Sequence, residues 1–275
     1  MERHHSLPAA HRKSRNLLIS LIIIAALLVL HFMTSCVTHS MVYPGSTMEL
    51  PDAPYGHSAQ AISIPAEDGT ILRGWFFNRG ANTPLVAMYG GNAMNVGAFT
   101  DIAAGDTTRS YLLMNYRGYG SSEGTPDEES LVADARHCIA TARSRMNGKS
   151  TPLYLVGFSL GSGVATQVAA AEKPEKLVLV CPFDSITAVA CGFVPVLPHI
   201  LPMDSWSSAD AAPGITCPVT ILRGQFDTIV PPDSTDALIR AFSTPPTVRS
   251  YPAGHNDIFS YPGFTEDLLH SLSGK

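Results

Sequence analysis

The feature that most constrains this chain is a serine flanked by glycines at residues 157–161, Gly-Phe-Ser-Leu-Gly. It follows the apolar, strand-like run 153–156 and precedes a run of small residues with helical character, 163–171. A serine hydroxyl is a weak nucleophile unless a sharp strand-to-helix turn exposes it to a base and to a substrate carbonyl. Glycines two residues to either side let such a turn close. We therefore expect Ser159 to lie on a nucleophile elbow.

A serine on such an elbow needs a histidine to accept its proton and an acid to orient that histidine, in the chain order Ser, Asp or Glu, His. Asp227 follows the β-branched segment 219–224, and His255 follows the strand-like segment 247–251. An open α/β sheet gathers its chemistry at the carboxyl ends of its strands. The sequence therefore predicts a catalytic triad of Ser159, Asp227 and His255.

Simpler interpretations exist for the two partners of Ser159. Asp227 is also compatible with an ordinary turn aspartate, and His255 with a surface-loop histidine. Asp184 follows the preceding apolar run and is the competing acid, whereas Asp257 lies only two residues beyond His255 and is expected to give local support. The order and the setting of the three residues together favour the triad.

Acyl transfer places negative charge on the carbonyl oxygen, and backbone N–H groups aimed at that oxygen stabilise it by roughly 3–4 kcal/mol each. The N–H of Leu160, directly after the nucleophile, is one expected donor. The apolar segment 84–89 runs into Gly-Gly-Asn-Ala at residues 90–93, and we predict the second donor there, on Asn92 with Ala93 as the next choice. A helix cap without a catalytic role is the alternative for this loop.

Composition and patterning indicate one α/β domain without a metal or a cofactor. Apolar runs alternate with helical patterns such as 128–146 and 234–241, which predicts a mostly parallel sheet with helices on both faces. The net charge of −5 comes with no basic stripe, so a nucleic-acid partner is not expected. The ten histidines and five cysteines lack the spacing of common metal sites.

With these residues in view, the chain resembles the α/β-hydrolase superfamily over about residues 61–272. It is most similar to the membrane-tethered serine hydrolases of the abhydrolase-domain branch, which include lipid esterases and protein depalmitoylases. Beyond the triad, the resemblance rests on Glu-Asp-Gly-Thr and Leu-Arg-Gly-Trp-Phe at 67–76, Gly-Asn-Ala with Asn95, and Asn-Tyr-Arg-Gly-Tyr-Gly-Ser-Ser-Glu-Gly at 115–124.

The resemblance implies an eight-stranded sheet whose early strands are antiparallel, and a short cap inserted at about residues 186–212. This insert is apolar and interrupted by prolines, as expected of a segment that shapes an acyl pocket, although ordinary packing is the alternative. One position departs from the family pattern. Relatives commonly carry His-Gly-Asn after the third strand, where this chain has Gly90. The difference bears on the shape of the oxyanion loop.

The N-terminus carries a targeting signal. Residues 17–30 are apolar apart from Ser20, and four basic residues precede them, at positions 3, 12, 13 and 15. Small residues before Cys36 resemble a bacterial lipoprotein signal, in which Cys36 would be lipidated and become the new N-terminus. An uncleaved anchor over about 17–33 is the alternative. Both interpretations place the basic end in the cytoplasm and the domain outside.

The expected organisation is a signal peptide or anchor over residues 1–35, a tether over 36–58, and the hydrolase domain over 59–275. Export would make the four cysteines of the domain candidates for disulfides, but spacing alone cannot pair them.

These observations favour a membrane-tethered serine hydrolase that cleaves carboxylic esters or thioesters, from a small molecule or a lipid, through an acyl-enzyme. A serine peptidase of the same fold is the alternative within the enzyme class. Dehalogenase chemistry is disfavoured because it needs a carboxylate where Ser159 stands. A non-catalytic envelope lipoprotein that uses the fold as a binding module is the alternative from another class.

Overall fold

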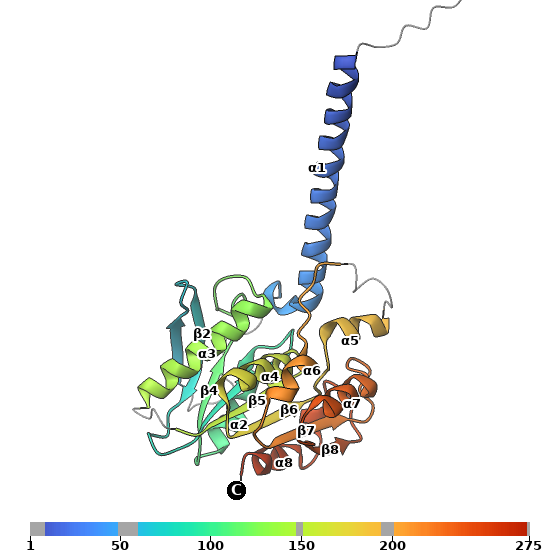
Figure 1. Ribbon diagram of the computed structural model, residues 1–275. Helices are drawn as coiled ribbons and strands as arrows, with labels where there is room; N and C mark the ends of the chain where they lie inside the picture. Colours follow the sequence, from blue (N-terminus) through green and yellow to red (C-terminus); the bar gives the residue numbers. More distant parts are fainter. Residues whose placement is uncertain (1–8, 49–59, 147–150, 194–200, 274–275) are drawn as a thin grey trace, which may run out of the picture.

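The computed structural model describes residues 9–48, 60–146, 151–193 and 201–273. Its centre is one eight-stranded sheet with the strand order β1-β2-β4-β3-β5-β6-β7-β8 (Figure 1). The strands are β1 (Gln60–Pro65), β2 (Ile71–Phe77), β3 (Leu85–Tyr89), β4 (Ser110–Met114), β5 (Leu153–Phe158), β6 (Lys176–Val180), β7 (Val219–Gly224) and β8 (Thr247–Tyr251).

Strand direction follows the pattern expected from the sequence. Strand β2 pairs antiparallel with β1 and with β4, and every later pairing is parallel. The central strands β3 and β4 are buried along their whole length, which explains why they are apolar at nearly every position rather than at alternate ones. The eight-stranded, mostly parallel fold predicted from the sequence is confirmed.

Helices cover both faces of the sheet, because each face carries its own buried apolar cluster. One cluster includes residues of α3, α4 and α7, and the other includes residues of α2 and α8. These helices are α2 (Thr100–Gly105), α3 (Glu128–Arg145), α4 (Leu160–Glu172), α7 (Pro232–Ala241) and α8 (Phe264–Ser271). The result is a three-layer domain with the sheet in the middle.

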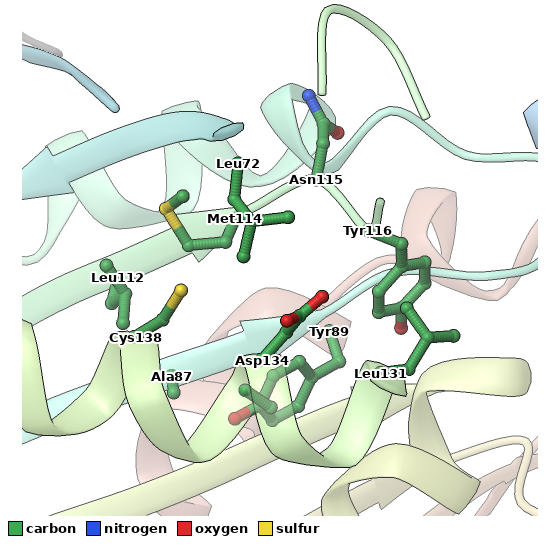
Figure 2. Close-up of a pocket in the computed structure, with 11 residues that line it drawn as sticks. Leu72, Ala87, Tyr89, Leu112, Met114, Asn115, Tyr116, Leu131, Asp134 and Cys138 are labelled. Atoms are coloured by element: carbon green, nitrogen blue, oxygen red, sulfur yellow. The ribbon is translucent and has the colours of Figure 1, made fainter. Parts of the chain in front are cut away.

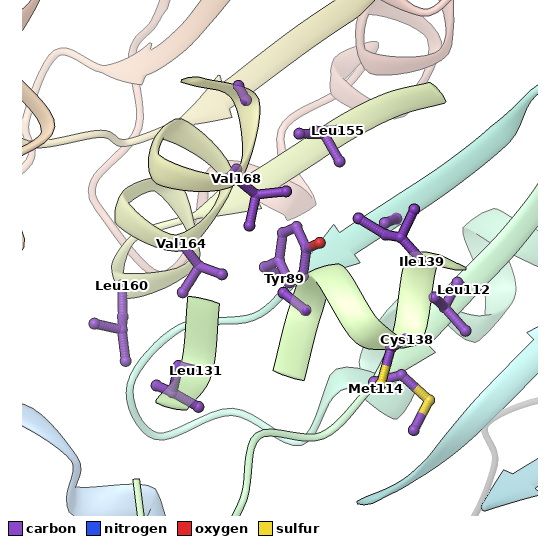
Figure 3. Close-up of a cluster of buried hydrophobic side chains, with 14 of the residues drawn as sticks. Tyr89, Leu112, Met114, Leu131, Cys138, Ile139, Leu155, Leu160, Val164 and Val168 are labelled. Atoms are coloured by element: carbon purple, nitrogen blue, oxygen red, sulfur yellow. The ribbon is translucent and has the colours of Figure 1, made fainter. Parts of the chain in front are cut away.

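The ring of Tyr89, at the end of β3, lies in the larger of the two clusters. Figure 3 shows it beside Val164 and Val168 of α4, with Leu131 and Cys138 of α3 nearby. All of these side chains are buried. Helices α3 and α4 therefore pack on the same face, beneath the loop that follows β3.

Helix α1 (Ala9–Val42) projects from the domain (Figure 1). Its segment Asn16–Val42, 27 residues, is long and apolar enough to cross a membrane. The most apolar part of this segment is not buried against the rest of the protein. Its last turn is docked instead: Tyr43, directly after the helix, is only 1% exposed. A short 3-10 turn, η1 (Pro44–Ser46), follows.

The segment expected to be a tether is thus ordered at its start. It is helical to Val42 and packed on the domain through η1, because Tyr43 has a buried position to fill. Residues 49–59 lie outside the described residues, so the boundary of the domain at residue 59 stays a prediction.

The expected cap contains α5 (Ile186–Phe193), α6 (Ser208–Ala211) and the 3-10 turn η4 (Ala212–Gly214). Residues 194–200 of the cap lie outside the described part of the chain. Trp206 fixes the rest of the cap, because its side chain is fully buried and its backbone N–H donates to Glu128 Oε2 at 2.9 Å. Helix α5 lies at the same end of the domain as the base of α1 (Figure 1).

Two buried tyrosines on neighbouring strands provide a test of the core. The Tyr111 hydroxyl donates to Asp106 Oδ2 at 2.6 Å, whereas among the described residues the Tyr89 hydroxyl has no hydrogen-bond partner. We predict that Tyr111→Phe lowers the free energy of unfolding by about 1–3 kcal/mol and that Tyr89→Phe leaves it unchanged or raises it. Denaturant unfolding of the two matched variants measures this difference. Equal losses would show that the Tyr89 hydroxyl is satisfied.

Candidate active site

Ser159 lies between the end of β5 and the first residue of α4, as the elbow requires. Its backbone is left-handed, with φ 52° and ψ −120°, a conformation that costs a non-glycine residue about 1–3 kcal/mol. The N–H of Ser159 donates to the carbonyl of Val180 on the neighbouring strand β6 at 3.0 Å. The strain is therefore held in place by the sheet and by the helix.

The two flanking glycines are required because the chain passes very close to itself here. A Cβ on Gly157 would lie 2.1 Å from the carbonyl oxygen of Gly161, and a Cβ on Gly161 would lie 2.3 Å from the carbonyl oxygen of Tyr89. Real Cβ atoms do not approach backbone atoms this closely. The glycine spacing in the sequence is thus a packing requirement of the turn between β5 and α4.

The structure brings Ser159, His255 and Asp227 together. His255 Nε2 lies 2.8 Å from Ser159 Oγ, and His255 Nδ1 lies 2.7 Å from Asp227 Oδ2. The three residues come from the loops after β5, β8 and β7. All are at least nine-tenths buried, so solvent competes little for these hydrogen bonds.

Asp227 is held as a carboxylate. Its Oδ1 accepts hydrogen bonds from the N–H groups of Ile229 at 2.9 Å and Val230 at 2.8 Å. Burial alone would raise the pKa of Asp227, but the hydrogen bond and charge of His255, with these two N–H groups, lower it overall. An ionised Asp227 can only accept, so the proton between the pair belongs on His255 Nδ1, which leaves Nε2 free to accept from Ser159.

The imidazole of His255 packs against Phe158, the residue before the serine. The two ring centroids are 5.1 Å apart, and Phe158 in turn meets Phe259 edge-on at 4.9 Å. The aromatic contact limits the orientations open to the imidazole. The sequence analysis did not identify Phe158 as part of the site. It stands between Gly157 and Ser159, at a position where the serine motif allows any residue.

The two competing aspartates are engaged elsewhere. Asp184 accepts from the hydroxyl of Ser234 at 2.6 Å, and Asp257 accepts from the N–H of Gly254 at 2.7 Å. Asp257 thereby shapes the turn that carries His255, the local support expected of it. Asp227 is the acid that contacts the histidine.

The expected oxyanion donors lie beside the serine. Leu160 is the first residue of α4, and it lines the same cavity as Ser159 and Asn92. A Cβ on Gly91 would lie 3.6 Å from Cβ of Ser159, so the loop after β3 passes directly over the nucleophile. The arrangement places two backbone segments next to the serine, where an oxyanion would form.

This cavity has a volume of about 220 Å³ and is lined mainly by apolar side chains. Two of its walls were not identified from the sequence. Met41 and Val42 come from the end of α1, and Ile229 and Val230 come from the loop that carries Asp227. The cap contributes the remaining apolar wall through Ile186, Val189, Ala190, Phe193 and Met203.

A second cavity lies between α3 and the sheet (Figure 2). It measures about 20 Å³, room for about one water molecule, and is lined by core side chains such as Leu112, Leu131 and Cys138. We interpret it as a packing defect of the core.

Cys181, Asp227 and His255 present ligand atoms within 4.8 Å of one another, the geometry of a possible metal site. However, Asp227 and His255 are bonded to each other. Burial, followed by the charge of Asp227, raises the pKa of the Cys181 thiol, which disfavours the thiolate that a metal needs. The donor set therefore fits a proton-transfer pair better than a metal. Cys36, Cys138, Cys181 and Cys217 are free thiols, and Cys36 is exposed.

Comparison with known proteins shows which families and folds this chain resembles. The family described as "Serine aminopeptidase, S33" matches residues 86–209, from β3 through the serine elbow to α6. Protein Rv2307c of Mycobacterium tuberculosis is 33% identical over 202 residues, covering 71% of this chain and 72% of that protein. Lysophosphatidylserine lipase ABHD12 of Danio rerio is 34% identical over 139 residues, 44% of this chain and 36% of that protein.

Among solved structures, an α/β hydrolase from Vibrio vulnificus matches with a TM-score of 0.68 at 17% identity, covering 88% of this chain and 93% of that one. At this identity the likeness concerns the fold.

The lowered pKa of Asp227 predicts a pH-dependent contribution to stability. A group whose folded pKa is lowered stabilises the fold fully above its ordinary value, here 3.8, and loses that contribution as the pH falls through the folded value. The difference in unfolding free energy between wild type and Asp227→Asn should therefore be constant above about pH 5 and shrink at lower pH. Denaturant unfolding between pH 7 and pH 3 measures it. A difference that stays constant to pH 3 would contradict the assignment.

Proposed function

Because the chain belongs to the α/β-hydrolase superfamily, in its abhydrolase-domain branch, we propose that it is a membrane-tethered serine hydrolase that cleaves carboxylic esters or thioesters. The observation that carries this proposal is the continuous hydrogen-bonded series from Ser159 through His255 to Asp227. A buried series of this kind is what a serine nucleophile needs in order to react.

In the first half-reaction, Ser159 Oγ attacks the substrate carbonyl carbon while its proton passes to His255 Nε2. Asp227 stabilises the imidazolium through the bond to Nδ1 and does not take the proton itself. The backbone N–H groups of Leu160 and Asn92 hold the oxyanion. When the tetrahedral intermediate collapses, the proton on Nε2 goes to the departing alkoxide or thiolate, and the acyl group remains on Ser159.

In the second half-reaction, water takes the place of the departed alcohol or thiol. His255 Nε2 removes a proton from this water as its oxygen attacks the acyl carbonyl. The second tetrahedral intermediate uses the same oxyanion donors. Its collapse returns the proton to Ser159 Oγ and releases the carboxylic acid. The reaction needs no metal and no cofactor.

The cavity beside Ser159 favours a substrate with an apolar acyl chain. Its walls are apolar, and the side chains at its rim are unusually exposed for their type: Met41 is 62%, Phe193 64% and Ile229 42% exposed. Such a rim favours a substrate presented from an apolar phase. The name of the relative ABHD12, a lysophosphatidylserine lipase, is in keeping with an acyl lipid.

The N-terminal helix supports the membrane tether in both forms considered above. As an anchor, α1 spans the bilayer; as a lipoprotein signal, it is cleaved before Cys36, whose side chain is exposed on α1. The basic residues before the apolar segment favour an orientation with that end in the cytoplasm and the domain outside. In both forms, residues 36–46 stay attached to the domain.

A serine peptidase is the second candidate, because the matching family is described as a serine aminopeptidase. The same triad can cleave an amide. Amide cleavage differs from ester cleavage in that His255 must protonate an amine, which is a poorer leaving group than an alcohol. The non-catalytic binding module is less favoured, since it gives no reason for burying a bonded serine, histidine and aspartate.

Steady-state kinetics of the full-length protein in detergent test the proposed function. We predict that Ser159→Ala and His255→Ala abolish the turnover of short and medium acyl esters, and that Asp227→Asn lowers kcat by about 10⁴-fold because it favours the wrong tautomer. Asp184→Asn is the matched control and should retain full activity. Turnover of a matched anilide faster than the ester would favour the peptidase. Full activity in Ser159→Ala would refute the proposal.

The acyl cavity generates a separate prediction about specificity. Ala190 lines the cavity, and Ala188 on the same helix is exposed and does not. Filling the cavity with Ala190→Phe should shift the preferred acyl chain to shorter lengths, by at least about tenfold in relative kcat/KM between octanoyl and acetyl esters. Ala188→Phe should leave the chain-length profile unchanged. An identical profile in all three proteins would place the acyl chain elsewhere.

A further inference from the structure

We propose that the turn after the membrane helix is a positioning part of the active site: the N–H of Gly45, together with the hydroxyl of Tyr119, holds the oxyanion loop 90–93 in its working orientation. This inference rests on the proposed function of Ser159. It assigns to the anchor segment a role in the chemistry, beyond attachment to the membrane.

The contact is direct. The carbonyl oxygen of Asn92 accepts hydrogen bonds from the N–H of Gly45 at 2.9 Å and from the hydroxyl of Tyr119 at 2.7 Å. Two donors converge on this one carbonyl from segments that are distant in the sequence. One donor belongs to η1, after α1, and the other to the glycine-rich turn after β4.

The neighbouring carbonyls of the loop are held as well. The Gly90 carbonyl accepts from the hydroxyl of Tyr116 at 2.8 Å, and the Gly91 carbonyl accepts from the N–H of Met94 at 3.3 Å. Tyr116 is buried and Tyr119 fully buried, and their rings meet edge-on with centroids 5.3 Å apart. The carbonyl oxygens of Gly90, Gly91 and Asn92 are therefore each held by at least one donor.

Fixing these oxygens fixes the N–H groups that would bind the oxyanion. A peptide unit is planar and trans, so its C=O and N–H point in opposite directions and cannot turn independently. The Gly91 carbonyl sets the direction of the Asn92 N–H. The Asn92 carbonyl sets that of the Ala93 N–H, the next choice of donor, and by fixing the peptide on the other side of Asn92 it also limits how far the Asn92 N–H can turn. Donors that are oriented before the reaction are what makes an oxyanion hole effective.

Position 45 has room only for glycine. A Cβ there would lie 2.3 Å from Cε1 and 2.8 Å from Cδ1 of Tyr119. Because Tyr119 is buried, its ring cannot swing into solvent to make room. A single added methyl group should therefore disturb both donors to Asn92 at once, while leaving Ser159, His255 and Asp227 untouched.

Gly45 is itself held in place by the end of α1. The Tyr43 hydroxyl donates to Asp204 Oδ2, and Trp206 Nε1 donates to the Tyr43 hydroxyl at 2.9 Å. His39 Nε2 lies 2.8 Å from the carbonyl oxygen of Pro126. These contacts lock the helix end to the cap and to the segment before α3, so the donor on Gly45 has a fixed position.

Kinetics of the full-length protein in detergent, with Gly45→Ala and Tyr119→Phe, test the inference. We expect kcat to fall about tenfold in Gly45→Ala and by a smaller factor in Tyr119→Phe, with KM within about twofold, because the oxyanion bonds form only in the transition state. Affinity for an acyl trifluoromethyl ketone, whose adduct carries the oxyanion, should fall by the same factor as kcat/KM. A purely structural role would not produce this proportionality.

A control variant and the Ser159→Ala protein make the outcome decisive. Gly214→Ala, where an added Cβ meets nothing within 4 Å, is the matched control and should behave as wild type. If Gly45→Ala fails to fold, Tyr119→Phe decides, since it keeps the ring and removes only the hydroxyl. The inference would be overturned if Tyr119→Phe and Gly45→Ala both fold and keep the wild-type kcat. It would also be overturned if their kcat falls while their affinity for the trifluoromethyl ketone stays unchanged. Activity in Ser159→Ala would instead refute the underlying function.

Discussion

The structure depends on one strained turn, in which Ser159 adopts a left-handed backbone between β5 and α4. The turn closes only because Gly157 and Gly161 allow backbone to touch backbone, and because β6 holds the serine N–H. This places the hydroxyl above the carboxyl edge of the sheet, where the loops after β7 and β8 deliver Asp227 and His255. The parallel sheet is thus the scaffold that turns three distant segments into one hydrogen-bonded series.

Helix α1 and the candidate active site are built as one unit. The end of α1 lines the acyl cavity through Met41 and Val42, and the turn after it bonds to the loop beside the serine. Here tyrosine hydroxyls from the turn after β4, with Gly45, hold the carbonyls of that loop. The docked end of α1 is therefore joined to the loop beside the serine by a direct hydrogen bond from the turn that follows it.

The sequence predicted the parts of this architecture that have a local signal. The glycines around Ser159 indicate that two backbone segments lie in close contact. The strands that end just before Asp227 and His255 indicate that both residues lie at the carboxyl edge of the sheet. The docking of α1 had no such signal, because Tyr43 and Gly45 look like the start of a linker until Asp204, Trp206 and Asn92 are brought beside them by the fold. Contacts between segments so distant in the chain leave no periodicity to read. The same holds for the aromatic support of His255 by Phe158.

The central claim is that Ser159 is an activated nucleophile, and the most direct measurement is intact-mass analysis of the full-length protein after reaction with a fluorophosphonate. The account predicts a single adduct that maps to Ser159, is absent from Ser159→Ala, and forms far more slowly in His255→Ala, because the hydroxyl depends on the imidazole for its reactivity. A folded wild-type protein that gains no adduct, or one whose adduct persists in Ser159→Ala, would contradict it.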